Sequence, residues 1–212
     1  MRRVAVLCEG QTEREFLGKE LAPIFYVHKL AITPVILVTK RFAEGGVIAG
    51  GGVNFDRVCA QLPALLGSFD SVTTFFDLYA FKDRKPCETA AQLQTRIAAR
   101  LGMPSHFRPY IQQYEFESLV FAIPHAGEIF GSTALSTKIS SVLSSCEGNA
   151  ELINDSAQTA PSVRLKALFA ELKLGRYDKV AFGSMLLKGN LNLIRRSCPR
   201  FDTWVSWLES LS

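Results

Sequence analysis

Residues 4–13 read VAVLCEGQTE, and this stretch indicates how the chain folds. Its first four residues are apolar and include two β-branched valines, which is typical of a buried strand. Thr12 followed by Glu15 has the pattern of a capping box, and apolar residues then recur at helical spacing over 16–25. The stretch therefore predicts a strand, a turn at residues 8–11 and a helix that opens directly after it.

The alternation of strand and helix continues through roughly the first half of the chain. Apolar, β-branched segments predict further strands over 32–39, 72–79 and 107–112. Asn54 is expected to cap a second helix, and a third helix is predicted over 89–101. The glycine-rich residues 44–53 are interpreted as a loop near the substrate entrance. This order is typical of βαβ units and a largely parallel sheet.

After Tyr114 the pattern contains only helices. They are predicted over 115–121, 137–146, 161–172, 179–187, 191–197 and 201–211. Pro161 suits the first position of its helix. The expected fold class is α/β, with a mostly parallel sheet flanked by helices over residues 1–121. A helical C-terminal cap over residues 122–212 is expected to pack on this core as one structural unit.

The composition excludes several classes of protein. The chain has 212 residues, of which 48% are hydrophobic and 21% charged, so it is neither a disordered nor a low-complexity protein. A net charge of +4 is too small to identify a nucleic-acid partner. The five cysteines contain no CxxC pair, which favours a reduced cytoplasm over a zinc ribbon or a disulfide framework. The first apolar run ends at Cys8, too early for a membrane span.

Acidic residues stand where strands are predicted to end. Glu9 follows the first strand and Asp77 lies near the end of the third, so a parallel sheet would bring them to one edge. Glu13 lies in the first turn of the next helix, and Glu115 and Glu117 follow the fourth strand. Carboxylates without histidine or cysteine partners favour a hard cation, Mg²⁺ or Mn²⁺.

The roles of these acids differ in how strongly the sequence supports them. A helix cap or a surface position explains Glu13 and Glu117 as well as metal binding does. Asp77 interrupts the apolar run Phe75-Phe76-Asp77-Leu78, where a charge without a function would be costly. We therefore favour a functional role for Glu9 and Asp77.

Basic residues near these acids are candidates to contact phosphate. Lys82 and Arg84 follow the third strand, and Arg164 lies in the first turns of the helix that opens at Pro161. For Arg195 and Arg196, by contrast, a solvated surface position is the better interpretation.

Ordered short motifs along the chain resemble known families. Residues 6–13 resemble the glutamate motif of the Toprim domain in nucleases of the overcoming-lysogenization-defect type. The whole chain resembles the bacterial domain-of-unknown-function family 4276, which has a Toprim-like core. The matching positions are 52–54, 76–79, 109–112, 115–117, 153–155, 160–162 with Arg164, Tyr177 with Lys179, and 198–201 with Trp204.

The resemblance implies a Toprim-like fold in which Glu9 and Asp77 hold a divalent metal for phosphodiester cleavage, with Glu13 as a helper. It also favours substrate contact by Arg164 and Lys179. The general Toprim pattern has a second aspartate two residues after the first, whereas this chain has Tyr79. Three alternatives remain open: Glu115, Glu117 or Asp83 replaces that ligand, the site binds one weak metal, or it is not catalytic.

The leading hypothesis is a Mg²⁺- or Mn²⁺-dependent nuclease subunit of a bacterial anti-phage defence system. Its expected partners are DNA or RNA, a second copy of the chain and a separately encoded ATPase, since the sequence has no GxxxxGK[ST] loop. One alternative is a non-catalytic regulatory subunit that binds nucleic acid or a nucleotide. Another is phosphoryl transfer on a small molecule.

Overall fold

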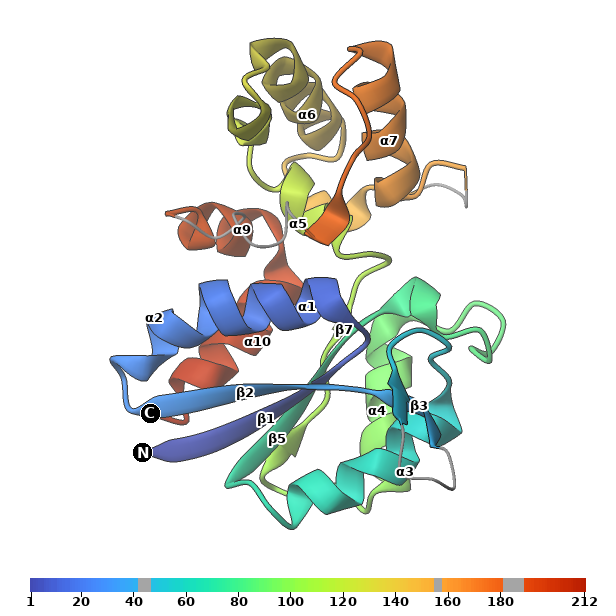
Figure 1. Ribbon diagram of the computed structural model, residues 1–212, viewed down its shortest axis with the longest axis vertical. Helices are drawn as coiled ribbons and strands as arrows, with labels where there is room; N and C mark the ends of the chain where they lie inside the picture. Colours follow the sequence, from blue (N-terminus) through green and yellow to red (C-terminus); the bar gives the residue numbers. More distant parts are fainter. Residues whose placement is uncertain (42–46, 155–157, 181–188) are drawn as a thin grey trace. The chain divides into compact units, whose positions relative to one another are not determined.

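The computed structural model describes residues 1–41, 47–154, 158–180 and 189–212 (Figure 1). The chain forms two compact units. The first comprises Met1–Gln112 and Leu208–Ser212, and the second comprises Gln113–Trp207.

The first unit is built on a parallel sheet with the strand order β2-β1-β5-β6, and β7 also pairs with β5. Every pairing in it is parallel, and Cys8 at the end of β1 lies opposite Phe75 of β5. The strands are β1 (Arg2–Cys8), β2 (Leu30–Ile36), β5 (Ser71–Asp77), β6 (Phe107–Arg108) and β7 (Ile111–Gln112). The mostly parallel sheet expected from the sequence is confirmed.

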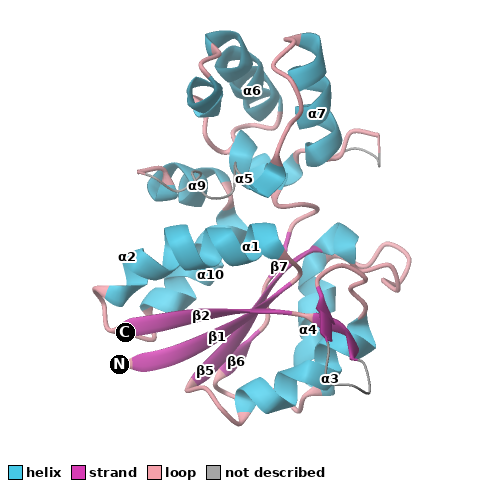
Figure 2. Cartoon of the chain, viewed as in Figure 1, coloured by secondary structure: helices cyan, strands magenta, loops and turns pink. Residues whose placement is uncertain are grey.

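Helices flank this sheet on both faces (Figure 2). One face carries α1 (Gln11–Glu15), the π-helical segment η1 (Phe16–Leu21) and α2 (Ala22–Tyr26). The other carries α3 (Phe55–Leu66) and α4 (Ala90–Arg100). The connection from β1 to β2 runs across the sheet in one direction, and the connections from β2 to β5 and from β5 to β6 run in the other. Since parallel crossovers are right-handed, the helices of these two sets lie on opposite faces. The direction of the crossovers therefore reverses between β1 and β5.

The core of this unit forms where β1 and β5 pack against the helices. Residues 4–8 of β1 are fully buried, and every residue of β5 is buried. The Phe75 ring lies 5.7 Å from that of Phe16 in η1 and 5.4 Å from that of Tyr110. These contacts anchor the end of β5.

Two predicted strands are interrupted. The segment predicted over 32–39 divides at Leu37, where the chain leaves the sheet and enters an antiparallel hairpin of β3 (Val38–Arg41) and β4 (Val47–Ala49). Part of the predicted glycine-rich loop is thus a strand, and its residues 44–46 lie outside the described residues. The strand predicted over 107–112 is divided into β6 and β7, because Pro109 has no N–H for the ladder.

The described part of the second unit is helical, as expected after Tyr114. Pro161 occupies the first turn of α7, as predicted. The helix α6 begins four residues earlier than predicted, because Ser132 caps it by accepting a hydrogen bond from the Leu135 N–H. Most of the helix predicted over 179–187 lies outside the described residues.

The α-helices described in this unit, the last of which ends beyond its boundary, are α5 (Glu117–Phe121), α6 (Thr133–Ser145), α7 (Pro161–Glu171), α9 (Leu191–Ser197) and α10 (Pro199–Glu209). Short 3₁₀ turns lie at η3 (Ala126–Phe130) and η4 (Ala150–Leu152). Among the described residues of either unit, no helix has the length and apolar character needed to cross a bilayer.

Candidate functional site

Two acidic residues lie at the carboxyl edge of the sheet, where the crossover direction reverses. Glu9 directly follows β1, and Asp77 is the last residue of the neighbouring strand β5. With Cys8 opposite Phe75, Glu9 stands one position and Asp77 two positions beyond the last ladder pair. Ligands of open α/β sheets bind at such a reversal, outside the carboxyl ends of the strands.

Glu13 supports the turn that carries Glu9. Its side chain is only 3% exposed, and its Oε2 accepts a hydrogen bond from the Gly10 N–H at 3.1 Å. The predicted capping box of Thr12 and Glu15 is therefore wrong by two residues. The helix begins at Gln11, as soon as the chain leaves β1, so the residue that reaches back to the cap is Glu13.

The end of the glycine-rich segment packs against the same turn. Gly50 has a φ of +87°, and a Cβ at this position would lie 3.3 Å from the carbonyl oxygen of Glu9. A left-handed backbone and so close an approach both favour glycine. A larger residue at Gly50 would therefore displace the turn that positions Glu9.

A buried amide lies beside Asp77. Gln112 of β7 is the ladder partner of Asp77, so the two side chains project from the same face. Gln112 is fully buried, and its Oε1 accepts a hydrogen bond from the Tyr110 hydroxyl at 2.6 Å. Its Nε2 has no hydrogen-bond partner within the described part of the chain. A buried donor of this kind calls for a ligand or a water molecule. The sequence did not single out Gln112 as a site residue, although a glutamine at the end of an apolar strand is a signal for one.

Two charged residues of the segment after β5, Asp83 and Arg84, contact other residues of the first unit. The Arg84 guanidinium lies 5.2 Å from the centre of the Tyr79 ring and donates to the Leu78 carbonyl at 3.4 Å. Asp83 accepts a hydrogen bond from the Phe55 N–H at 2.8 Å, at the start of α3. Lys82 is exposed. Of the predicted phosphate contacts in this segment, Lys82 is thus the more accessible.

In the second unit, Glu115 and Arg164 both serve the start of α7. Glu115 Oε2 accepts a hydrogen bond from the Ser162 N–H at 2.8 Å. Arg164 donates through Nε to the Thr159 carbonyl at 2.8 Å. Since the first N–H groups of a helix lack partners within the helix, the Glu115 carboxylate caps α7.

Glu117 and Lys179 form an ion pair in this unit. Glu117 is 2% exposed, and the distance from its Oε2 to Lys179 Nζ is 3.6 Å. The Lys179 ammonium also lies 5.5 Å from the centre of the Phe116 ring. Two residues that the sequence assigned to different roles, metal ligand and substrate contact, are thus brought together.

A family model described as a domain of unknown function (DUF4276) matches residues 8–209, nearly the whole chain. The chain belongs to the DUF4276 family. The match spans most of both units, as the ordered motifs of the sequence predicted. Searches of curated proteins and of solved structures found no match.

The predicted site residues of this DUF4276 chain divide between the units. The first unit contains Glu9, Glu13, Asp77, Lys82 and Arg84, and the second contains Glu115, Glu117, Arg164 and Lys179. Among the residues that the structure describes, no group of three or more His, Cys, Asp or Glu side chains is placed to hold a metal ion.

The donor set of the sheet edge still fits Mg²⁺ or Mn²⁺. Mg²⁺ is commonly bound through one or two carboxylates and completes its coordination shell with water and phosphate oxygens. Glu9 and Asp77 supply two such carboxylates, and the Gln112 Nε2 is a hydrogen-bond donor for a water or phosphate oxygen rather than a metal ligand. The oxygen-rich character of this edge is therefore compatible with a hard cation.

Proposed function

We propose that this protein hydrolyses phosphodiester bonds of nucleic acid with Mg²⁺ or Mn²⁺ bound at the carboxyl edge of its sheet. The observation that carries the proposal is the pair of acidic residues, Glu9 and Asp77, at the ends of neighbouring parallel strands where the crossovers reverse. The resemblance of residues 6–13 to a Toprim glutamate motif supports the same assignment.

The residues of this edge have distinct roles in the proposal. Glu9 and Asp77 hold the metal, which when bound supplies an activated water and neutralises phosphate charge. Glu13 keeps the Gly10 turn in place through its hydrogen bond. Gln112 offers its buried amide as a donor to a substrate or water oxygen. Lys82 attracts the phosphate backbone from the exposed side of the edge.

The proposed metal ligands, Glu9 and Asp77, both belong to the first unit. Glu117 is paired with Lys179, and Glu115 caps α7. A neighbouring ammonium group disfavours a divalent cation at Glu117 by charge repulsion. The assignment of Glu115 and Glu117 as metal ligands stays a prediction, tested below.

The cellular setting is part of the same proposal. The lack of a GxxxxGK[ST] loop in the sequence supports an ATPase on a separate chain. The resemblance to Toprim nucleases supports anti-phage defence in the cytoplasm, with a homodimer as a further expected assembly.

One observation favours a second function. Tyr79, which stands where the Toprim pattern has its second aspartate, packs on Arg84. A tyrosine at this position supplies no carboxylate for a metal. This arrangement favours a regulatory subunit that binds nucleic acid or a nucleotide without cleaving it.

A cleavage assay with matched variants tests the proposal. The full chain, with and without the candidate ATPase, is incubated with single- and double-stranded DNA and RNA. Cleavage is expected with Mg²⁺ or Mn²⁺ and is expected to disappear with chelator and in Glu9→Ala and Asp77→Ala. Asp56→Asn, which removes an exposed carboxylate of α3, is the control and should retain activity.

The outcomes separate the two functions. Ca²⁺ is expected to support nucleic-acid binding with little cleavage, because it neutralises phosphate charge but activates water less well than Mg²⁺ or Mn²⁺ does. If no nucleic acid is cleaved under any of these conditions while Asp77→Ala still binds nucleic acid, the nuclease proposal fails and the binding subunit is favoured.

A further inference from the structure

The second unit contains a cavity of about 700 Å³ between α7 and the segment that follows it. Three cationic residues line it: Lys166 from α7, and Arg176 and Lys179 from the following segment. Glu117 lies at its base and is almost fully buried. A volume of this size is in the range of small-molecule sites.

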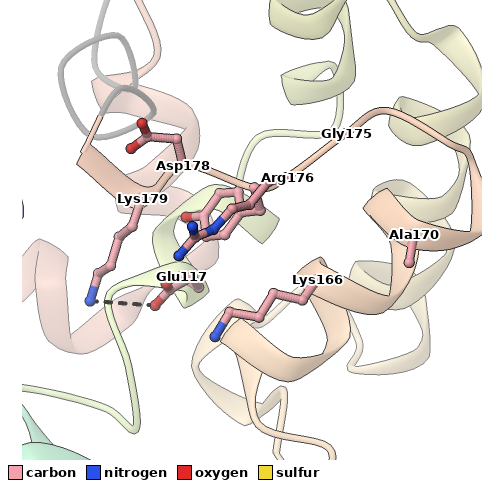
Figure 3. Close-up of a pocket in the computed structure, with 8 residues that line it drawn as sticks. Glu117, Lys166, Ala170, Gly175, Arg176, Asp178 and Lys179 are labelled. Carbon is pink, nitrogen blue, oxygen red and sulfur yellow. Dashed lines mark ion pairs between the residues drawn. The ribbon is translucent and has the colours of Figure 1, made fainter.

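The charges in the cavity favour an anion. Figure 3 shows the side chains of Lys166, Arg176 and Lys179 extending toward Glu117, whereas the Asp178 carboxylate points away from them. Asp178 is engaged by the backbone, since its Oδ1 accepts a hydrogen bond from the Val180 N–H at 2.9 Å. The three cationic groups outnumber the two carboxylates that line the cavity, those of Glu117 and Asp178, so its charge is on balance positive.

The cationic groups are partly held in place before any ligand binds. The Lys179 ammonium is fixed by the Glu117 carboxylate and the face of the Phe116 ring. Tyr177, between two of the cations, is 7% exposed and packs edge-on against Phe169 of α7 at 5.5 Å. Anchoring the segment in this way reduces the conformational entropy lost when an anion binds.

We propose that this cavity binds a phosphate monoester, carried either by a free nucleotide or by the end of a nucleic-acid chain. A phosphate monoester is close to a dianion at neutral pH and offers several strong acceptor oxygens. The Arg176 guanidinium matches two of these oxygens in one plane, and lysine ammonium groups act as point charges. The cavity is larger than inorganic phosphate requires, so the phosphate is expected to be attached to a nucleoside.

This inference does not depend on cleavage at the sheet edge. All the residues that carry it belong to the second unit, whereas Glu9 and Asp77 belong to the first. Binding can therefore be measured with chelator present, where the proposed metal chemistry is silent. Loss of binding in chelator would count against this proposal alone, and loss of cleavage with Mg²⁺ or Mn²⁺ would count against the nuclease proposal alone.

The experiment measures binding of matched ligands by calorimetry and fluorescence anisotropy in chelator. One arm compares a 5′-phosphorylated oligonucleotide with the same oligonucleotide bearing a 5′-hydroxyl. The other compares a nucleoside monophosphate with its nucleoside. The phosphorylated ligand should bind more tightly in at least one arm, and the arm with the larger difference identifies the source of the phosphate.

Variants assign the binding to the cavity. Lys166→Met and Arg176→Gln, both at exposed positions, should each weaken the phosphorylated ligand by about tenfold through loss of a charge-assisted contact. Lys173→Gln removes an exposed cation outside the cavity and should have little effect. Equal affinity for phosphorylated and unphosphorylated ligands in both arms, or an equal loss in Lys173→Gln, would overturn the proposal.

Discussion

The sheet edge of the first unit and the cavity of the second unit have opposite charge. At the sheet edge, Glu9 and Asp77 follow strands, and the short link to the backbone places them close to the ends of the ladder. In the cavity, Lys166 and Arg176 extend from a helix and a loop around one buried carboxylate. Strand ends thus provide carboxylates suited to a cation, whereas long side chains on a helix and a loop provide cations suited to phosphate.

The largest expected effect separates the two regions by their response to a metal. Asp77→Asn should weaken Mn²⁺ binding by more than about 100-fold, since losing even a group that supports a ligand costs 10- to 100-fold. Glu117→Gln should leave Mn²⁺ affinity unchanged, because Lys179 occupies the space where a cation would bind. Calorimetric titration of both variants measures the contrast. A loss of affinity in Glu117→Gln would instead support its assignment as a metal ligand.

A smaller effect is expected at the start of α7. Glu115→Gln should lower the free energy of unfolding by about 1 kcal/mol, because the carboxylate caps the helix and interacts with its dipole. Urea denaturation measures this change, with the exposed Glu147→Gln as control. If stability is retained and Mn²⁺ affinity falls, Glu115 is a ligand, as the sequence suggested, and the contrast between the regions weakens.

The smallest effect concerns a buried carboxylate of the second unit and its pH dependence. Glu151 accepts hydrogen bonds from the N–H groups of Arg200 at 2.9 Å and Phe201 at 3.1 Å, yet burial raises its pKa. Because folding raises the pKa of Glu151, its contribution to the free energy of unfolding is largest when the pH is below its pKa in the unfolded chain. That contribution is lost as the pH rises through the pKa of Glu151 in the folded protein.

Glu151→Gln removes this titration. Its stability relative to the unsubstituted chain should therefore improve as pH rises from the unfolded pKa of Glu151 to above the folded one. Chemical denaturation across that pH range measures the change. If stability depends on pH in the same way in both proteins, burial does not raise the pKa of Glu151.

Much of the fold follows from local signals in the sequence. The first strand, the helix cap at Asn54, the helix over 90–100 and Pro161 at the start of α7 all lie where the pattern predicts them. These features depend on residues within a few positions of one another, through hydrophobic periodicity and capping. Such short-range preferences can be read without knowing the path of the chain.

The interruptions of predicted strands show the limit of this reasoning. The Leu37 N–H still donates to the Cys8 carbonyl at 2.8 Å, as the last bond of the ladder with β1, whereas the Leu37 carbonyl accepts from the Gly50 N–H at 2.9 Å. Both partners come from other segments of the chain. Apolar character continues through this region, so periodicity alone extends the strand too far.

For the candidate site, the sequence by itself determined that Glu9 and Asp77 lie at the ends of strands of a parallel sheet, and the tertiary structure made those strands neighbours. Tertiary structure decided which other polar groups surround them and which acids serve as caps. Glu115 meets the N–H of Ser162, 47 residues away, and Gln112 meets Asp77 only because β7 pairs with β5. Hydrogen bonds and ion pairs act over a few ångströms in space, so the role of each polar side chain depends on which distant segment the fold brings within that range.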